Sequence, residues 1–147
     1  MPTVLTLDEH QYAAARAQDA ALREFELGPA PSDPRAREVW MQHAAGFILF
    51  EKVRAAGLAT LEPTAPSAVR TAVELAVDAA TYALVMQIDG VSGGLRGSRT
   101  SIELTFGVEM TQDDAVVAKL DLREGDGMCM GFHSWVEGDF GRQPVVR

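Results

Sequence analysis

The chain has 147 residues and a formal net charge of −8, with 47% hydrophobic and 23% charged residues. This length fits a single domain, residues 1–147, and the composition is that of a folded globular protein rather than a disordered one. The excess of acid disfavours binding to nucleic acid or to anionic membranes, because their phosphates attract Lys and Arg.

The first predicted helix begins after Thr6, whose hydroxyl can cap it, and ends before residues 28–31, Gly-Pro-Ala-Pro. Asp8 and Glu9 fall in its first turn, where carboxylates are favoured beside unpaired N–H groups. Its apolar positions form an intermittent stripe filled in by alanines, so we expect an amphipathic surface helix. These positions are Tyr12, Ala15, Leu22 and Phe25.

The next two predicted helices are apolar over more than one face. Residues 34–56 follow the start signal Ser-Asp-Pro at 32–34, and Gly57 is expected to end that helix in the left-handed conformation. Residues 67–88 carry apolar side chains nearly all round, apart from one stripe of three charged residues. Such a helix is either central in its domain or part of an oligomer interface. We therefore expect these two helices to form the core as a hydrophobic hairpin.

Hydrophobic and polar residues alternate from Ile102 to Met110, which is the clearest period-two pattern in the chain. Residues 112–114, Gln-Asp-Asp, are expected to form a turn, and Val116 to Leu122 the partner strand of a β-hairpin. Because a two-stranded hairpin is marginal by itself, it must lie on the helices or join a partner's sheet.

A short C-terminal helix is predicted because Met128, Phe132 and Trp135 recur at helical spacing. Asp126 is expected to cap its start and Gly138 to end it. The predicted fold is therefore α+β. It has three N-terminal helices, of which two form the hydrophobic hairpin and one is amphipathic, followed by a small antiparallel β-hairpin or sheet and the short C-terminal helix.

Four residues in this last segment share one helix face through i+3 and i+4 steps, and their side chains can bind zinc or another transition metal. One helix rarely closes a metal shell, and neither H-E-x-x-H nor C-x-x-C occurs in the chain. The alternative is that the Cys129 thiol is buried as a small apolar group, while His133 and Glu137 are exposed to solvent. The candidate ligands are Asp126, Cys129, His133 and Glu137.

Aromatic side chains and acids gather in the same segment, as they do in many protein recognition patches. The alternative, which is favoured for Trp135, is that the aromatic rings cover the hydrophobic core. The candidate recognition patch consists of Phe132, His133, Trp135, Glu137 and Phe140.

Two further patterns are typical of chemistry but lack the context that it requires. Residues 90–94, Gly-Val-Ser-Gly-Gly, match a nucleophile elbow, and Asp126 and His133 follow in the hydrolase order, yet no βαβ scaffold surrounds them. The same glycine-rich loop could cradle an anion through backbone N–H groups, although a flexible connector explains it better. His43 lies within an apolar helix, where a lone histidine is usually hydrogen-bonded to a neighbour.

The single cysteine, Cys129, excludes an internal disulfide and fits a reducing compartment. The first ten residues lack the basic and then apolar pattern of a secretory signal. No stretch of uninterrupted apolar sequence reaches the length of a membrane-spanning helix, so we expect a cytoplasmic protein.

Three features favour a non-catalytic protein-interaction module that needs no cofactor: no convergent catalytic set, an acidic balance, and a surplus of apolar helix surface. An immunity-like or regulatory protein that binds a basic partner is one concrete version. A homodimer, formed through the hairpins or the third helices, is compatible with it. The alternative is a small metal-dependent or hydrolytic enzyme that uses the region of Cys129 and His133.

Overall fold

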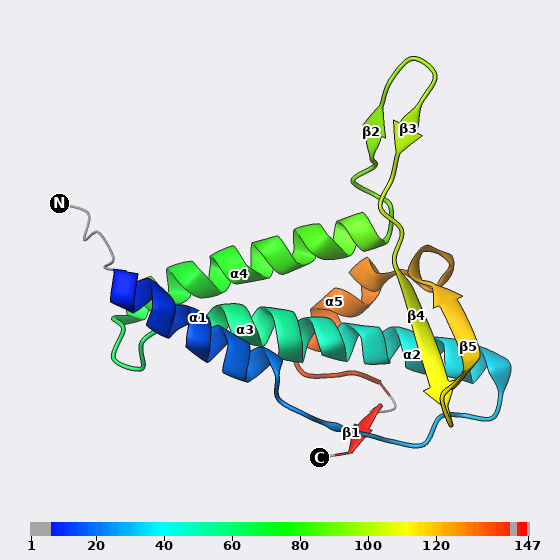
Figure 1. The fold of residues 1–147 in the computed structure, drawn as a ribbon, viewed down its shortest axis with the longest axis horizontal. Helices are drawn as coiled ribbons and strands as arrows, with labels where there is room; N and C mark the ends of the chain where they lie inside the picture. Colours follow the sequence, from blue (N-terminus) through cyan, green and yellow to red (C-terminus); the bar gives the residue numbers. More distant parts are fainter. Residues whose placement is uncertain (1–6, 142–143, 147) are drawn as a thin grey trace. The chain divides into compact units, whose positions relative to one another are not determined.

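The computed structural model describes residues 7–141 and 144–146 of the chain (Figure 1). Within these residues the chain combines α-helices with three two-stranded antiparallel sheets, which makes it an α+β protein, as predicted. Contacts divide the chain into two compact units. The first unit comprises residues 1–24 and 49–81, and the second comprises residues 25–48 and 82–147. A single domain over residues 1–147 stays a prediction.

The first unit begins with helix α1, Leu7–Ala21, and the expected cap at Thr6 lies outside the described residues. The helix ends at Ala21, whereas the predicted apolar stripe included Leu22 and Phe25. The predicted helix was therefore too long at its C-terminal end. The Nζ atom of Lys52 donates to the carbonyl oxygens of Ala21, at 3.1 Å, and of Arg23. These contacts satisfy backbone carbonyls that a helix end leaves without partners.

The predicted helix over residues 34–56 is present as three successive segments: α2 (Pro34–Ile48), the π-helix η1 (Leu49–Arg54) and α3 (Ala55–Leu58). Gly57 was expected to stop it in the left-handed conformation, but it lies inside α3 instead. A Cβ atom at Gly57 would lie 3.3 Å from Val77 Cγ1, so the glycine permits a close approach to α4 (Ser67–Ile88).

The boundaries predicted for α4 are confirmed, and of its two predicted positions, at the centre of the domain or in an oligomer interface, its low burial does not fit the first. No side chain from 67 to 80 is buried, and the buried positions of this helix are Thr81, Val85 and Ile88. In the second unit α2 packs against α5 (Met128–Val136), whereas in the first unit α3 approaches α4 at Gly57 and Val77. The apolar periodicity of residues 67–88 correctly predicted a helix. Which other helix each apolar helix packs against depends on the tertiary structure.

Among the described residues, α4 is long and apolar enough to cross a membrane by length and composition, although the sequence pattern argued against any such segment. Only 17% of its apolar window is buried. Core helices of soluble proteins meet the same criterion, so the helix is weak evidence for a membrane location.

The predicted hairpin is present as strands β4 (Gly107–Gln112) and β5 (Ala115–Asp121). Asp113 and Asp114 form its two-residue turn with φ angles of 49° and 61°, the left-handed conformation that type I′ hairpin turns require. The predicted first strand began at Ile102, but that residue belongs to the separate strand β3, Ser101–Ile102.

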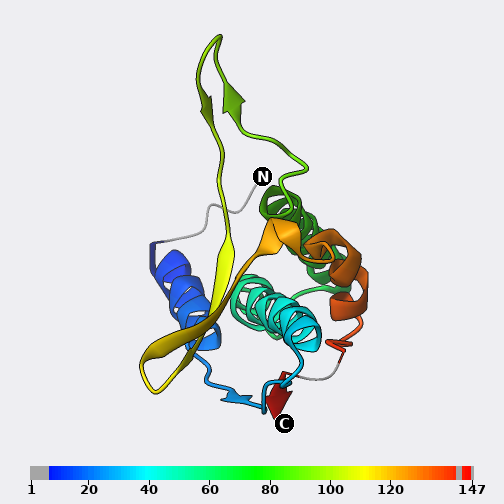
Figure 2. The same cartoon turned by 90° about the vertical axis from the view of Figure 1, so that its right-hand side faces the viewer.

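Two smaller sheets complete the second unit. Strand β2 (Leu95–Arg96) pairs with β3, and this hairpin extends beyond the helices of its unit in two views (Figures 1 and 2). Strand β1 (Glu26–Leu27) pairs with β6 (Val145–Val146), which joins segments far apart in the sequence.

Candidate functional site

The aromatic residues of the candidate recognition patch form the core of the second unit. Trp135 is 2% exposed, Phe132 is 7% exposed and Phe140 is 3% exposed. The alternative interpretation therefore holds for these three rings, and the proposed aromatic patch is corrected. His133 and Glu137 are exposed, and the His133 ring lies against the rings of Phe132 and Tyr82.

Trp135 lies against α2 in an unusually close contact. A Cβ atom at Gly46 of α2 would lie 2.4 Å from its Cε2, and one at Gly131 of α5 would lie 2.3 Å from its Cζ2. Neither position has room for a side chain, so the two glycines let both helix backbones approach the indole ring. This packing explains why α5 contains Gly131, although glycine is a poor helix former.

The Nε1–H group of Trp135 donates to Nδ1 of His43 at 3.0 Å. His43 is thus hydrogen-bonded to a neighbour, as expected for a lone histidine in an apolar helix. Because Nδ1 accepts, the neutral ring carries its proton on Nε2. Burial lowers the pKa of His43, while the negative charges of Asp139 and Asp126 act in the opposite direction.

The start of α5 is capped by Asp89, not by the predicted Asp126. The two carboxylate oxygens of Asp89 accept the backbone N–H groups of Met128, at 2.7 Å, and Cys129, at 2.8 Å. The residue before the helix, Gly127, makes no side-chain cap. A carboxylate at this position satisfies unpaired donors and interacts favourably with the helix dipole.

Cys129 lies in the same capping arrangement, since its backbone N–H donates to the Asp89 carboxylate. Burial raises the pKa of Cys129 to about 11, and the hydrogen bond and charge of the Asp89 carboxylate add to the shift. A thiol with this pKa stays protonated at neutral pH, and only the thiolate is a good nucleophile or metal ligand.

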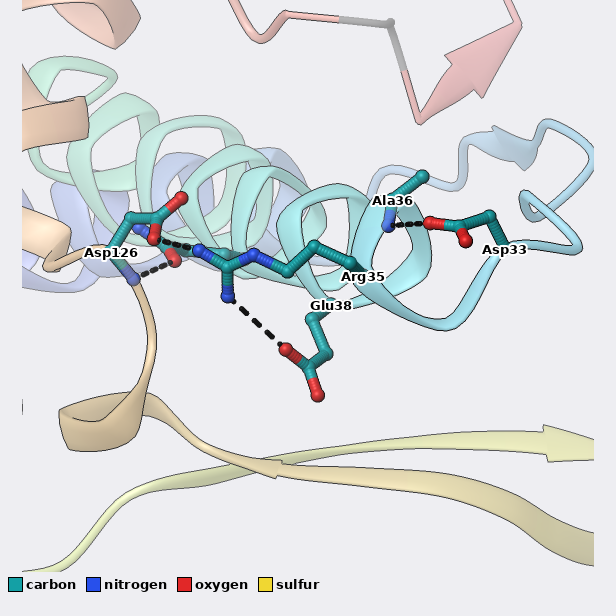
Figure 3. Close-up of polar contacts among 6 residues, drawn as sticks. Asp33, Arg35, Ala36, Glu38 and Asp126 are labelled. Atoms are coloured by element: carbon teal, nitrogen blue, oxygen red, sulfur yellow. Dashed lines mark hydrogen bonds and ion pairs between the residues drawn. The ribbon is translucent and has the colours of Figure 1, made fainter.

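Asp126, another candidate ligand, is occupied by contacts with α2 (Figure 3). Its carboxylate pairs with the guanidinium of Arg35, which also contacts Glu38 at 3.2 Å. Its backbone N–H donates to Gln42 Oε1 at 2.8 Å, and Gln42 Nε2 donates to the Gly127 carbonyl at 3.0 Å. Gln42 is a buried polar residue that the sequence patterns did not single out. Its role is to hold the segment that precedes α5.

The remaining patterns of catalytic type do not come together in the part of the chain that the structure describes. No group of three or more His, Cys, Asp and Glu side chains among residues 7–141 and 144–146 is arranged to hold a metal ion. Ser92 lies in an exposed turn after α4, and no hydrogen bond among these residues joins its hydroxyl to Asp126 or His133.

Beside α2 there is a mainly apolar cavity of about 380 Å³. All of its described lining residues lie on one face of α2, except Asp33, which precedes the helix. The polar side chains of the lining therefore do not come from several different elements, as those of a binding site usually do. The lining residues are Asp33, Arg35, Ala36, Val39, Trp40 and His43.

A further surface with exposed apolar side chains is the hairpin of β2 and β3, which we name the arm and define as residues 91–104. Its large apolar side chains are turned to solvent: Leu95 is 74% exposed, Ile102 64% and Leu104 62%. The same three residues line a hollow of about 470 Å³ together with Gln87 and residues 92–94. Exposed apolar side chains that cluster in this way mark interaction surfaces.

No protein-family model, curated protein or solved structure matches this chain.

Proposed function

We propose that this chain is a non-catalytic protein-interaction module and that the arm is its contact element. The observation that carries the proposal is the row of Leu95, Ile102 and Leu104, which the described fold leaves largely in water. Soluble proteins rarely leave several large apolar side chains exposed together unless a partner covers them.

The apolar surface of α4 supports the same proposal. Val69 is about half exposed and Leu75 is more exposed still. The net charge of −8 fits a partner that is basic, because complementary charge speeds association and orients the encounter. An immunity-like or regulatory protein remains the concrete version of this proposal, and a cytoplasmic location remains part of it.

No specific observation favours the enzymatic alternative. Among the described residues no three His, Cys, Asp or Glu side chains are grouped to hold a metal ion, and the Asp126 carboxylate is paired with Arg35. Elemental analysis of protein purified without added metal provides the check, since a stoichiometric transition metal would favour the enzyme.

The proposal is tested by the substitution pair Leu95→Asp/Ile102→Asp in the full chain. Tagged wild-type protein is purified from cells that produce it naturally, and its bound polypeptides are quantified together with its mass in solution. We expect a stoichiometric polypeptide, either another protein or a second copy, that the double variant loses. Val117→Asp, an exposed apolar position on β5, is the matched control and should retain it. A wild-type protein that is alone and monomeric contradicts the proposal.

A further inference from the structure

The hydrogen bond between Trp135 and His43 requires a neutral histidine. The indole Nε1–H group can only donate, and it donates to Nδ1 of His43 at 3.0 Å. A protonated imidazole carries a hydrogen on both ring nitrogens, so neither nitrogen can accept. Protonation of His43 and this hydrogen bond therefore exclude each other.

The indole ring has little room to adjust when His43 stops accepting. Trp135 is 2% exposed, and there is no space for a Cβ atom beside it at Gly46 of α2 or at Gly131 of α5. A buried donor that loses its acceptor destabilises the packing around it. Because the ring contacts the backbones of both helices, any shift of the ring also disturbs the contact between α2 and α5.

A carboxylate lies where it can attract the protonated ring. A Cβ atom at Gly141 would lie 2.8 Å from Nε2 of His43, so the Gly141 backbone lies close to that nitrogen. The N–H group of Gly141 donates to Oδ1 of Asp139 at 2.9 Å. Burial lowers the pKa of His43, and the negative charge of Asp139 opposes this effect because it favours the imidazolium.

The other charged groups around His43 are engaged in contacts of their own. Asp126 acts on the ring in the same direction as Asp139, but its carboxylate is paired with Arg35. Asp33 and Arg35 line the same cavity as His43, and the Asp33 carboxylate caps the start of α2. The titratable side chains at α5 itself are Cys129, which lies beside Asp89, and the exposed His133 and Glu137. Asp139 is therefore the described carboxylate best placed to attract the imidazolium.

We propose that His43 is a pH-sensitive switch between α2 and α5. Neutral His43 accepts the Trp135 N–H group and holds the two helices together. Protonated His43 releases the indole and is attracted to Asp139, so the packing of α5 on α2 loosens while the rest of the second unit stays folded. The switch depends neither on the arm nor on a partner.

Nuclear magnetic resonance of the full chain tests the switch, because it follows the His43 ring nitrogens and the Trp135 indole N–H separately. The readout is the protection of this N–H against hydrogen exchange, relative to a free indole at the same pH. Since the pKa of His43 is lowered, the change should occur below about pH 6.5. We expect the protection to fall by about tenfold as His43 is protonated.

Three variants distinguish the switch from a general effect of acid. His43→Asn keeps an oxygen acceptor near the position of Nδ1 but cannot be protonated, so its indole protection should not depend on pH. His133→Asn, which removes an exposed histidine of α5, is the matched control and should behave like wild type. Asp139→Asn keeps an acceptor for Gly141 but removes the charge, so His43 should be protonated only at a lower pH.

Far-UV circular dichroism over the same pH range reports whether each protein stays folded. Constant indole protection while His43 is protonated overturns the switch, and so does an equal loss of protection in His43→Asn. Loss of the helical signal at the same pH also overturns it, since the unit then unfolds as a whole. An unchanged midpoint in Asp139→Asn overturns Asp139 as the group that attracts the protonated ring.

Discussion

Gly46 lies on the buried face of α2, where helix propensity and packing predict opposite effects of a substitution. An alanine in a helix interior is more stable than a glycine by roughly 1 kcal/mol. In this fold, however, a Cβ atom at Gly46 would lie 2.4 Å from Cε2 of Trp135. Non-bonded carbon atoms pack at about 3.5–4.0 Å, so the ring or the helix must move by about 1 Å to admit the methyl group.

The Trp135 ring has little freedom to make that movement. It is almost fully buried, its Nε1–H is bonded to His43, and the backbone at Gly131 touches it as well. Overpacking a core in this way typically costs about 1–3 kcal/mol, and the absence of free space places this site towards the upper end. After the propensity gain is subtracted, we expect Gly46→Ala to lower the free energy of unfolding by about 2 kcal/mol.

Urea unfolding followed by tryptophan fluorescence and far-UV circular dichroism measures this change, because both tryptophans, Trp40 and Trp135, are buried in the second unit. Gly57→Ala is the matched control. Its Cβ atom would meet the two Cγ atoms of Val77 at 3.3 Å, a contact that small shifts relieve, so we expect a change below about 1 kcal/mol. A Gly46→Ala protein at least as stable as wild type, with an unchanged dependence on urea, would refute the packing argument.

Three further outcomes are expected. Asp89→Ala removes both acceptors at the start of α5 and should cost about 1–2 kcal/mol in urea unfolding, whereas equal stability would show that water replaces the cap. The pKa of His43 is lowered in the folded state, so the unfolded chain binds more protons. The contribution of His43 to stability should therefore be complete above about pH 6.5 and fall as the pH drops through the folded pKa. His43→Asn should flatten the stability curve below about pH 6.5. The pKa of Cys129 is about 11, so about one thousandth of the thiol is ionised at pH 8. A disulfide reagent should therefore label Cys129 far more slowly in the folded protein than in the unfolded one. Equal labelling rates would contradict the raised pKa.

Most elements with local signals were predicted from the sequence. Residues 32–34 start a helix because Asp33 accepts the Ala36 N–H and proline tolerates the first helical position, as Figure 3 shows for the cap. Residues 113–114 turn the β4–β5 hairpin because aspartates tolerate positive φ. The boundaries of α4 and α5 also follow from propensity and periodicity over neighbouring residues.

The candidate site was predicted much less well, because its interactions join residues far apart in the chain. The hydrogen bond between His43 and Trp135 spans 92 residues, and the cap from Asp89 to Met128 spans 39. No periodicity signals such a partner. Asp126 satisfied the local rule for a helix cap but pairs with Arg35, whereas Asp89 reaches the same helix through tertiary packing.

Sequence by itself determined the α+β class, the main helices and the one long hairpin, since each depends on side-chain period and turn chemistry within a short segment. Only the tertiary structure decided which apolar residues are buried. Hydrophobicity alone does not distinguish Trp135, which fills the space left by two glycines, from Leu95, which the fold leaves in water. Burial depends on what the rest of the chain brings against a side chain, and that is a property of the whole fold.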